Sequence, residues 1–271
     1  MTATEPVGTL LGAVPGDLEA LRTGHVALAG LYFDHSAKTP GARFAARQVR
    51  YESPPSGADP AWVDLGDLNV FPLQPDRNAA TLADQAGRIL ATGARLLVVG
   101  GDYGASPGLL EGLLRAFPGE RASVIRMSRR LDLDRTCHGA SGRAVTHRLA
   151  SLLVGGLDAI AFAGLSGEMP IEEVRIAGPG PRLSAKESTD RIVEALRDWA
   201  EGFDRLYLSV DEDCVGDVSG ILSSLGGLQV ILAHASGHLP DLDLPGRTAT
   251  RAIVARVHAL AGLMTGAGPC R

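Results

Sequence analysis

The sequence predicts an α/β fold in three layers, with a mostly parallel central sheet covered by helices on both faces. Short apolar runs rich in Val, Ile and Leu alternate with segments in which apolar residues recur every three or four positions. This alternation is typical of parallel strands joined by helical crossovers. The 271 residues contain no internal repeat and no long linker, so we expect one domain over residues 1–271.

Six apolar runs predict buried strands. They cover residues 26–33, 96–100, 123–127, 159–163, 206–210 and 228–233. Each run is short and almost continuously apolar, as strands covered on both faces are.

Five segments between these runs predict amphipathic helices. They cover residues 79–91, 107–116, 142–153, 188–199 and 248–263. Ser188 is a suitable cap for the fourth helix, because its hydroxyl can accept a hydrogen bond from a free backbone N–H group of the first turn.

The composition excludes several classes of protein. Apolar residues make up 45% and charged residues 21%, which is ordinary for a globular protein, and the net charge of −5 gives no general attraction to nucleic acid or an anionic membrane. No apolar run reaches the roughly 18 residues of a membrane span, and the first residues lack a secretory signal. Cys137, Cys214 and Cys270 show no Cys-x-x-Cys spacing, so we expect reduced thiols and a cytoplasmic location.

Polar clusters follow three of the predicted strands, within residues 98–103, 125–132 and 208–213. Ligands of parallel sheets collect outside the carboxyl ends of the strands. Any one cluster alone would be interpreted as the solvated end of a strand. Three together predict a functional site at this edge.

The third cluster contains Asp211 and Asp213, which are two residues apart and so project to the same side of an extended chain. Asp132 supplies a third carboxylate from another strand end. Such carboxylates repel one another unless a positive charge lies among them.

These clusters belong to a longer series of motifs that occur in a fixed order. The series comprises the Pro-Gly-Ala-Arg-Phe stretch within residues 39–50, the Val-Asp-Leu-Gly-Asp run at 63–67, the Gly-Gly-Asp region at 97–106, the Ser-x-Asp-x-Asp strand at 206–213, and Pro240, Asp243 and Thr248. It covers nearly the whole chain and resembles the ureohydrolase family of arginases and agmatinases. The resemblance implies an α/β/α fold, a two-manganese centre that hydrolyses guanidinium groups, and a homo-oligomer, either a trimer or a hexamer.

The sequence departs from this family at the metal ligands. Tyr103 stands where the family has histidine, Ser128 where it has aspartate, and Arg130 where it has histidine. An arginine is permanently protonated and repels a dication at a ligand position. We therefore expect no dinuclear metal centre.

Of the expected ligands Asp132, Asp211 and Asp213 remain, and we expect Arg130 to lie among them and offset their repulsion. If a metal binds, it is a single weakly held manganese ion on these three aspartates.

The end of the site that recognises guanidinium in the family is altered too. Counting back three residues from Pro240, the family's glutamate is Gly237 here. His138 is either a substrate-facing acid or base, or a histidine that satisfies backbone groups at a helix start. His238 is a candidate substrate contact, although for it and His234 a surface or packing role is the simpler interpretation.

Three function classes remain. The first is a repurposed, metal-independent enzyme that acts on a small molecule by acid and base chemistry. The second is a single-metal hydrolase of a guanidine or amidine compound, and the third is an inactive pseudoenzyme or partner subunit. The candidate catalytic residues are Asp132, His138, Asp211, Asp213 and Tyr103, and the candidate substrate contacts are Arg130, Ser128, Asp102 and His238.

Overall fold

Nine strands form one sheet in the computed structural model, which describes residues 8–34, 41–53, 59–71, 74–132, 145–165, 180–211, 218–237 and 248–265. The strands are β1 (Val14–Pro15), β2 (Val26–Leu31), β3 (Trp62–Leu68), β4 (Arg95–Val99), β5 (Ala122–Met127), β6 (Ile160–Leu165), β7 (Arg182–Ser184), β8 (Arg205–Asp211) and β9 (Val230–Ser236). Their order in the sheet is β1-β3-β2-β4-β9-β8-β5-β6-β7, and every neighbouring pair is parallel.

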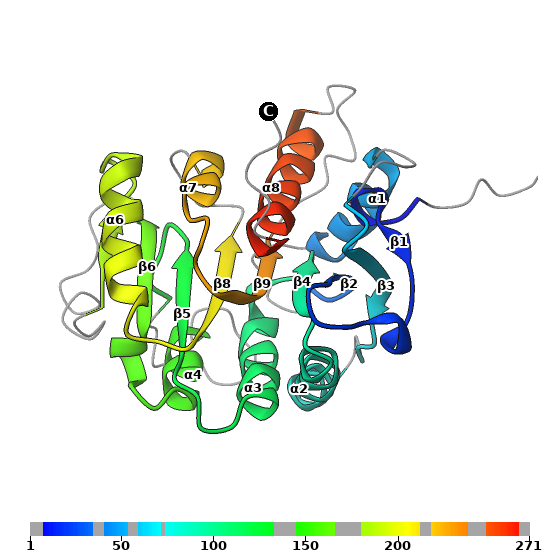
Figure 1. Cartoon of the computed structure of the whole chain (residues 1–271), viewed down its shortest axis with the longest axis horizontal. Coiled ribbons are helices and arrows are strands. Elements are labelled where there is room, and N and C mark those ends of the chain that lie inside the picture. Colours follow the sequence, from blue (N-terminus) through cyan, green and yellow to red (C-terminus); the bar gives the residue numbers. More distant parts are fainter. Residues whose placement is uncertain are drawn as a thin grey trace, which may run out of the picture.

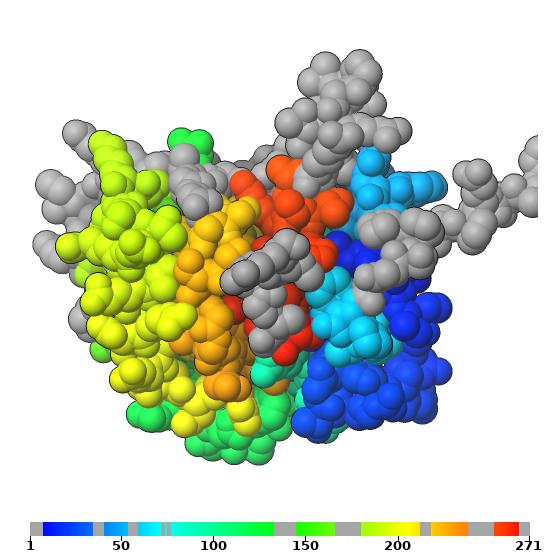
Figure 2. All heavy atoms as spheres, turned by 45° about the horizontal axis from the view of Figure 1, so that its top comes forward, coloured from blue at the N-terminus to red at the C-terminus, as the bar shows by residue number. Residues whose placement is uncertain are grey.

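Helices cover both faces of the sheet (Figure 1). One face packs against α2 (Pro75–Ala91), α3 (Ser106–Ala116) and α4 (Val145–Leu152), and the other packs against α1 (Ala45–Glu52), α6 (Thr189–Ala200), α7 (Val218–Ser224) and α8 (Thr248–Thr265). In Figure 2 the second set lies side by side, from α6 in yellow-green to α1 in light blue. The predicted three-layer α/β/α fold is therefore confirmed.

All six predicted strands and all five predicted helices are present, with ends displaced by a few residues. The Ser188 side chain caps α6 as expected, accepting a hydrogen bond from the N–H of Arg191. The largest displacement is at the start of α2, which was predicted at residue 79 and begins at Pro75. Among the strands the largest is in β9, which was predicted at 228–233 and extends to Ser236. It continues past its apolar residues because it pairs with β8 as far as Asp211 and Ser236.

No helix in the part of the chain described is long and apolar enough to cross a membrane.

The order of the strands brings the predicted polar clusters to one edge. β4, β9, β8 and β5 are consecutive in the sheet, although β4 and β5 are separated from β8 and β9 by a long stretch of chain. Because all four are parallel, their carboxyl ends meet at the same edge.

Two glycines shape the end of β4. Gly100 and Gly101 have φ values of 88° and 70°, which L side chains rarely adopt, and a Cβ on Gly101 would lie 2.6 Å from a methyl group of Leu31. The Gly100 N–H donates to the carbonyl of Ala235 at 2.9 Å, and the Gly101 N–H to that of Ala42 at 3.1 Å. The turn thereby fixes the residues that follow it against β9 and the segment before α1.

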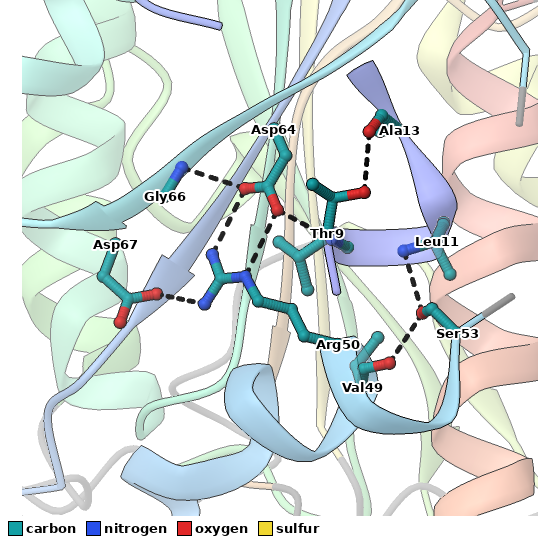
Figure 3. A network of polar contacts seen from close by, with 10 residues as sticks. Thr9, Leu11, Ala13, Val49, Arg50, Ser53, Asp64, Gly66 and Asp67 are labelled. Atoms are coloured by element: carbon teal, nitrogen blue, oxygen red, sulfur yellow. Dashed lines mark hydrogen bonds and ion pairs between the residues drawn. The ribbon is translucent and has the colours of Figure 1, made fainter. Parts of the chain in front are cut away.

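A buried ion pair links α1 to β3, in the part of the sheet formed by β1, β3 and β2 (Figure 3). Arg50 of α1 donates through Nε and Nη2 to both carboxylate oxygens of Asp64 in β3, each at 3.2 Å, and through Nη1 to Asp67 at 2.6 Å. Asp64 also accepts from the N–H of Leu10 at 2.7 Å. Burial alone would lower the pKa of Arg50, but its bonds to the two aspartates outweigh burial and raise that pKa. The pair links the N-terminal segment, α1 and β3.

We predict that Arg50→Ala lowers the free energy of unfolding by about 3–5 kcal/mol, because it leaves the buried Asp64 carboxylate without its cation. Asp67→Ala is the matched control, since the Asp67 side chain is 47% exposed, and it should cost about 1 kcal/mol or less. Urea unfolding of both variants measures the difference. Equal losses would contradict this account of the pair.

Candidate active site

Two of the predicted carboxylates meet on one buried guanidinium. The Nη2 atom of Arg126 lies 3.1 Å from Oδ2 of Asp132 and 3.0 Å from Oδ2 of Asp211. Arg126 lies within β5, Asp211 ends β8, and Asp132 follows β5. The side chains of the two aspartates are 7% and 6% exposed and that of Arg126 is 1% exposed, so the three charges are shielded from solvent.

Hydroxyl groups complete this cluster. Arg126 Nη1 donates to Oγ1 of Thr146 in α4 at 2.7 Å, and the Thr146 hydroxyl donates to the carbonyl of Leu131 at 2.5 Å. The Ser236 hydroxyl at the end of β9 donates to Oδ1 of Asp211. We call Arg126, Asp132, Asp211, Thr146 and Ser236 the guanidinium cluster.

The guanidinium remains charged in this setting. Burial alone would lower the pKa of Arg126, but the charges of Asp132 and Asp211 and their hydrogen bonds outweigh burial and raise it. The buried cation therefore supplies the positive charge that the neighbouring carboxylates require.

Asp132 adopts an unusual backbone conformation, with φ of 50° in the left-handed region. Few residues other than glycine occupy this region, and aspartate is among those that tolerate it. Such conformations persist where surrounding contacts enforce them. The ion pair with Arg126 is one such contact of Asp132.

The prediction that Arg130 lies among the carboxylates is wrong. Arg129 and Arg130 are exposed beyond the end of β5, and the backbone N–H of Arg130 donates to Oγ of Ser128 at 3.3 Å. Alternate residues of a strand share a face, so Arg126 points to the same side as Ser128. The cation comes from inside the strand rather than from the loop after it.

Arg126, Thr146 and Ser236 are site residues that sequence reasoning missed. The signal for Arg126 is present, because it is the one charged residue in the otherwise apolar and small run 122–127. A charge within a buried strand demands a partner.

The remaining described candidates lie around the cluster. Asp102 is fully buried and caps the short helix η4 (Tyr103–Ala105) by accepting from the N–H of Gly104 at 2.8 Å. Tyr103 is 7% exposed, and the Cζ atom of Arg126 lies 5.9 Å from the centre of its ring. Ser128 is 1% exposed.

Three candidates, His138, Asp213 and His238, lie outside the residues that the structure describes, as do all three cysteines. Among the described residues, no group of three or more His, Cys, Asp or Glu side chains is placed to hold a metal ion.

His234 has the packing role expected for it. It is fully buried in β9, where Nε2 lies 3.0 Å from the carbonyl oxygen of Gly100 and Nδ1 lies 3.4 Å from the hydroxyl of Ser106. Burial lowers the pKa of His234 from 6.5 to about 4. The imidazole is therefore neutral at pH 7 and links the start of α3 to the turn after β4.

We predict that His234 makes stability depend on pH. Because its pKa is lower in the folded chain, the unfolded chain binds more protons between pH 6.5 and about 4, and stability falls as pH drops through this window. The loss from this residue is about 2 kcal/mol at about pH 5. Glutamine does not titrate, so His234→Gln should lose this part of the pH dependence of stability. The wild type then loses stability between about pH 7.5 and 5 that the variant does not lose, and the difference between their free energies of unfolding becomes smaller.

The control for this prediction is Leu232→Ala, which removes a fully buried side chain of the same strand and no titratable group. Its free energy of unfolding should differ from that of the wild type by the same amount at every pH of the same urea titrations. A gap between wild type and His234→Gln that stays constant with pH would contradict the assignment.

Comparisons with known proteins agree with this architecture. A family model described as "Arginase family" matches residues 24–218. The chain is 30% identical over 162 residues to a formimidoylglutamase of Klebsiella pneumoniae, an alignment that covers 56% of this chain and 50% of that protein. The chain thus spans about half the length of this curated relative.

Solved structures share the whole fold at low sequence identity. A proclavaminate amidino hydrolase from Streptomyces clavuligerus matches with a TM-score of 0.79 and 17% identity, covering 97% of this chain and 98% of that one. A formimidoylglutamase from Bacillus subtilis matches with a TM-score of 0.77 and 16% identity, covering 100% and 96%. The family model covers well over half of the sequence and these structures have the same fold, and we conclude that the chain belongs to the arginase family.

Proposed function

We propose that this chain is a metal-independent member of the arginase family that does not hydrolyse guanidines through a metal centre. One observation carries the proposal. The carboxylates of Asp132 and Asp211, which the family resemblance assigns to metal ions, both accept hydrogen bonds from the buried guanidinium of Arg126.

The described donors do not suit a pair of manganese ions. Manganese needs carboxylate or imidazole lone pairs, and a guanidinium has none to offer. Ser128 and Tyr103 present hydroxyl groups at the positions of an aspartate and a histidine, and Arg130 is turned to solvent. These donors therefore support no reaction step through a metal.

The same contacts argue against acid and base roles for the two carboxylates. A general base must reach the substrate with an available lone pair. Asp211 accepts from Arg126 at Oδ2 and from Ser236 at Oδ1, and both aspartates are buried. We propose that they balance the charge of Arg126 and fix three strand ends, which favours the role of a non-hydrolytic binding or partner subunit.

A metal-independent enzyme is the second candidate, and Tyr103 favours it. A phenol that faces a fixed cation can act as a proton donor or acceptor, and the guanidinium of Arg126 lies over this ring. His138 and Asp213 would supply further groups in such an enzyme.

The test is the manganese content of purified protein, measured by elemental analysis before and after incubation with manganese and desalting. We predict near-zero metal in both samples and no hydrolysis of guanidine or formimidoyl compounds. One or two tightly held ions per chain, with hydrolysis that depends on them, would overturn the proposal.

The same assay separates the two candidates. Hydrolysis by metal-free protein that is lost in Tyr103→Phe would favour the enzyme. The conservative change removes the phenolic hydroxyl and keeps the ring beside Arg126, so unchanged thermal stability serves as its control.

A further inference from the structure

We propose that Asp132, Asp211 and Thr146 form a guanidinium-binding site that the chain fills with its own Arg126. The inference builds on the proposed absence of a metal and names the cation for which the site is shaped. The guanidinium of Arg126 then occupies the site and excludes any external guanidine.

The acceptors match the outline of a guanidinium. One amino group, Nη2, reaches both carboxylates at 3.1 and 3.0 Å, and the other, Nη1, reaches the Thr146 hydroxyl at 2.7 Å. A planar cation with fixed N–H directions can make these three bonds together. An ammonium group on a flexible stem is a point charge and lacks this geometry.

Two of the three acceptors, Thr146 and Asp211, are held in place by a further hydrogen bond. The Thr146 hydroxyl donates a hydrogen bond to the carbonyl of Leu131, so its oxygen presents lone pairs to Arg126. The Ser236 hydroxyl donates to the other oxygen of Asp211. Neither bond involves Arg126, so both remain possible when its side chain is removed. Acceptors fixed in advance bind with a smaller loss of entropy.

The walls of the site come from separate elements. Thr146 lies on α4, Asp211 ends β8, Ser236 ends β9, and the ring of Tyr103 faces the guanidinium from η4. Truncating Arg126 therefore removes the occupant and leaves Asp211 and Thr146 on elements of their own, whereas Asp132 follows the strand that carries Arg126.

The second buried arginine shows how this site differs from an ordinary ion pair. Arg50 bonds Asp64 through two nitrogens, but its other partner, Asp67, has a side chain that is 47% exposed. The three described side chains bonded to the guanidinium of Arg126, those of Asp132, Asp211 and Thr146, are all buried. Attraction between charges is stronger where water is excluded.

Chemical rescue tests the proposal. Arg126→Ala should unfold at a lower temperature than wild type, and guanidinium chloride well below denaturing concentration should raise that temperature with saturation. Sodium chloride and ammonium chloride at equal ionic strength should not raise it, because their cations lack the planar N–H pattern. Urea should not raise it either, because urea is uncharged. Wild type should show no rise, since its site is filled.

Leu208→Ala is the matched control. Leu208 is fully buried in β8, one residue away from Ser209, which pairs in the sheet with Arg126, so the change opens an apolar cavity on the opposite face. Guanidinium should not raise its unfolding temperature. If Arg126→Ala does not fold, its refolding yield with and without guanidinium replaces the thermal measurement, and Arg126→Lys should be less stable than wild type.

Three results would overturn the proposal. They are no rescue of Arg126→Ala, equal rescue by guanidinium and ammonium, and stronger rescue by manganese than by guanidinium. Failure of the proposed function is a separate result, because it is measured as metal bound to the wild type. Wild type that binds manganese, together with an Arg126→Ala variant rescued by guanidinium, would refute the function and leave the guanidinium site standing.

Discussion

Two carboxylates buried at neighbouring strand ends require a positive charge between them, and Arg126 supplies it. The parallel sheet brings the carboxyl ends of β5, β8 and β9 together. Asp211 and Ser236 lie beside each other because they pair in the sheet, independently of the loops. Removing two ionised groups from water costs several kcal/mol per charge unless each is paired and hydrogen-bonded. The same guanidinium contacts Asp132, whose backbone is left-handed, and attaches α4 through Thr146.

The sheet thus contains two buried arginine centres, one in each half. Arg50 ties α1 and the N-terminal segment to β3, and Arg126 ties α4 to β5 and β8. Both use an arginine with two aspartates, but only the second lies where the polar strand ends converge. The turn at Gly100 and Gly101 and the buried His234 connect these halves through β4 and β9.

Most of the fold follows from the hydrophobic pattern, because buried parallel strands and their helices carry strong local signals. The strand β3 and the short elements β1, β7, α1 and α7 were not predicted as elements. Asp64, Gly66 and Asp67 interrupt the apolar run of β3, and the other four elements contain too few residues to show a pattern. At the site, the sequence correctly indicated that Asp132 and Asp211 converge. It misplaced the cation, because the alternation of β5 was not extended inward to Arg126. Thr146 could not have been predicted, as its contact depends on how α4 packs against β5.

The chain belongs to the arginase family, and its Arg126 guanidinium bonds Asp132 and Asp211. The central claim is that this arginine takes the place of the metal ions that the family resemblance assigns to these two carboxylates. The most direct measurement is a crystal structure of protein grown with manganese, with anomalous diffraction recorded at the manganese absorption edge. The account predicts the Arg126 guanidinium between Asp132 and Asp211 and no manganese peak at either carboxylate. A manganese ion bound by these carboxylates, with Arg126 displaced, would contradict it.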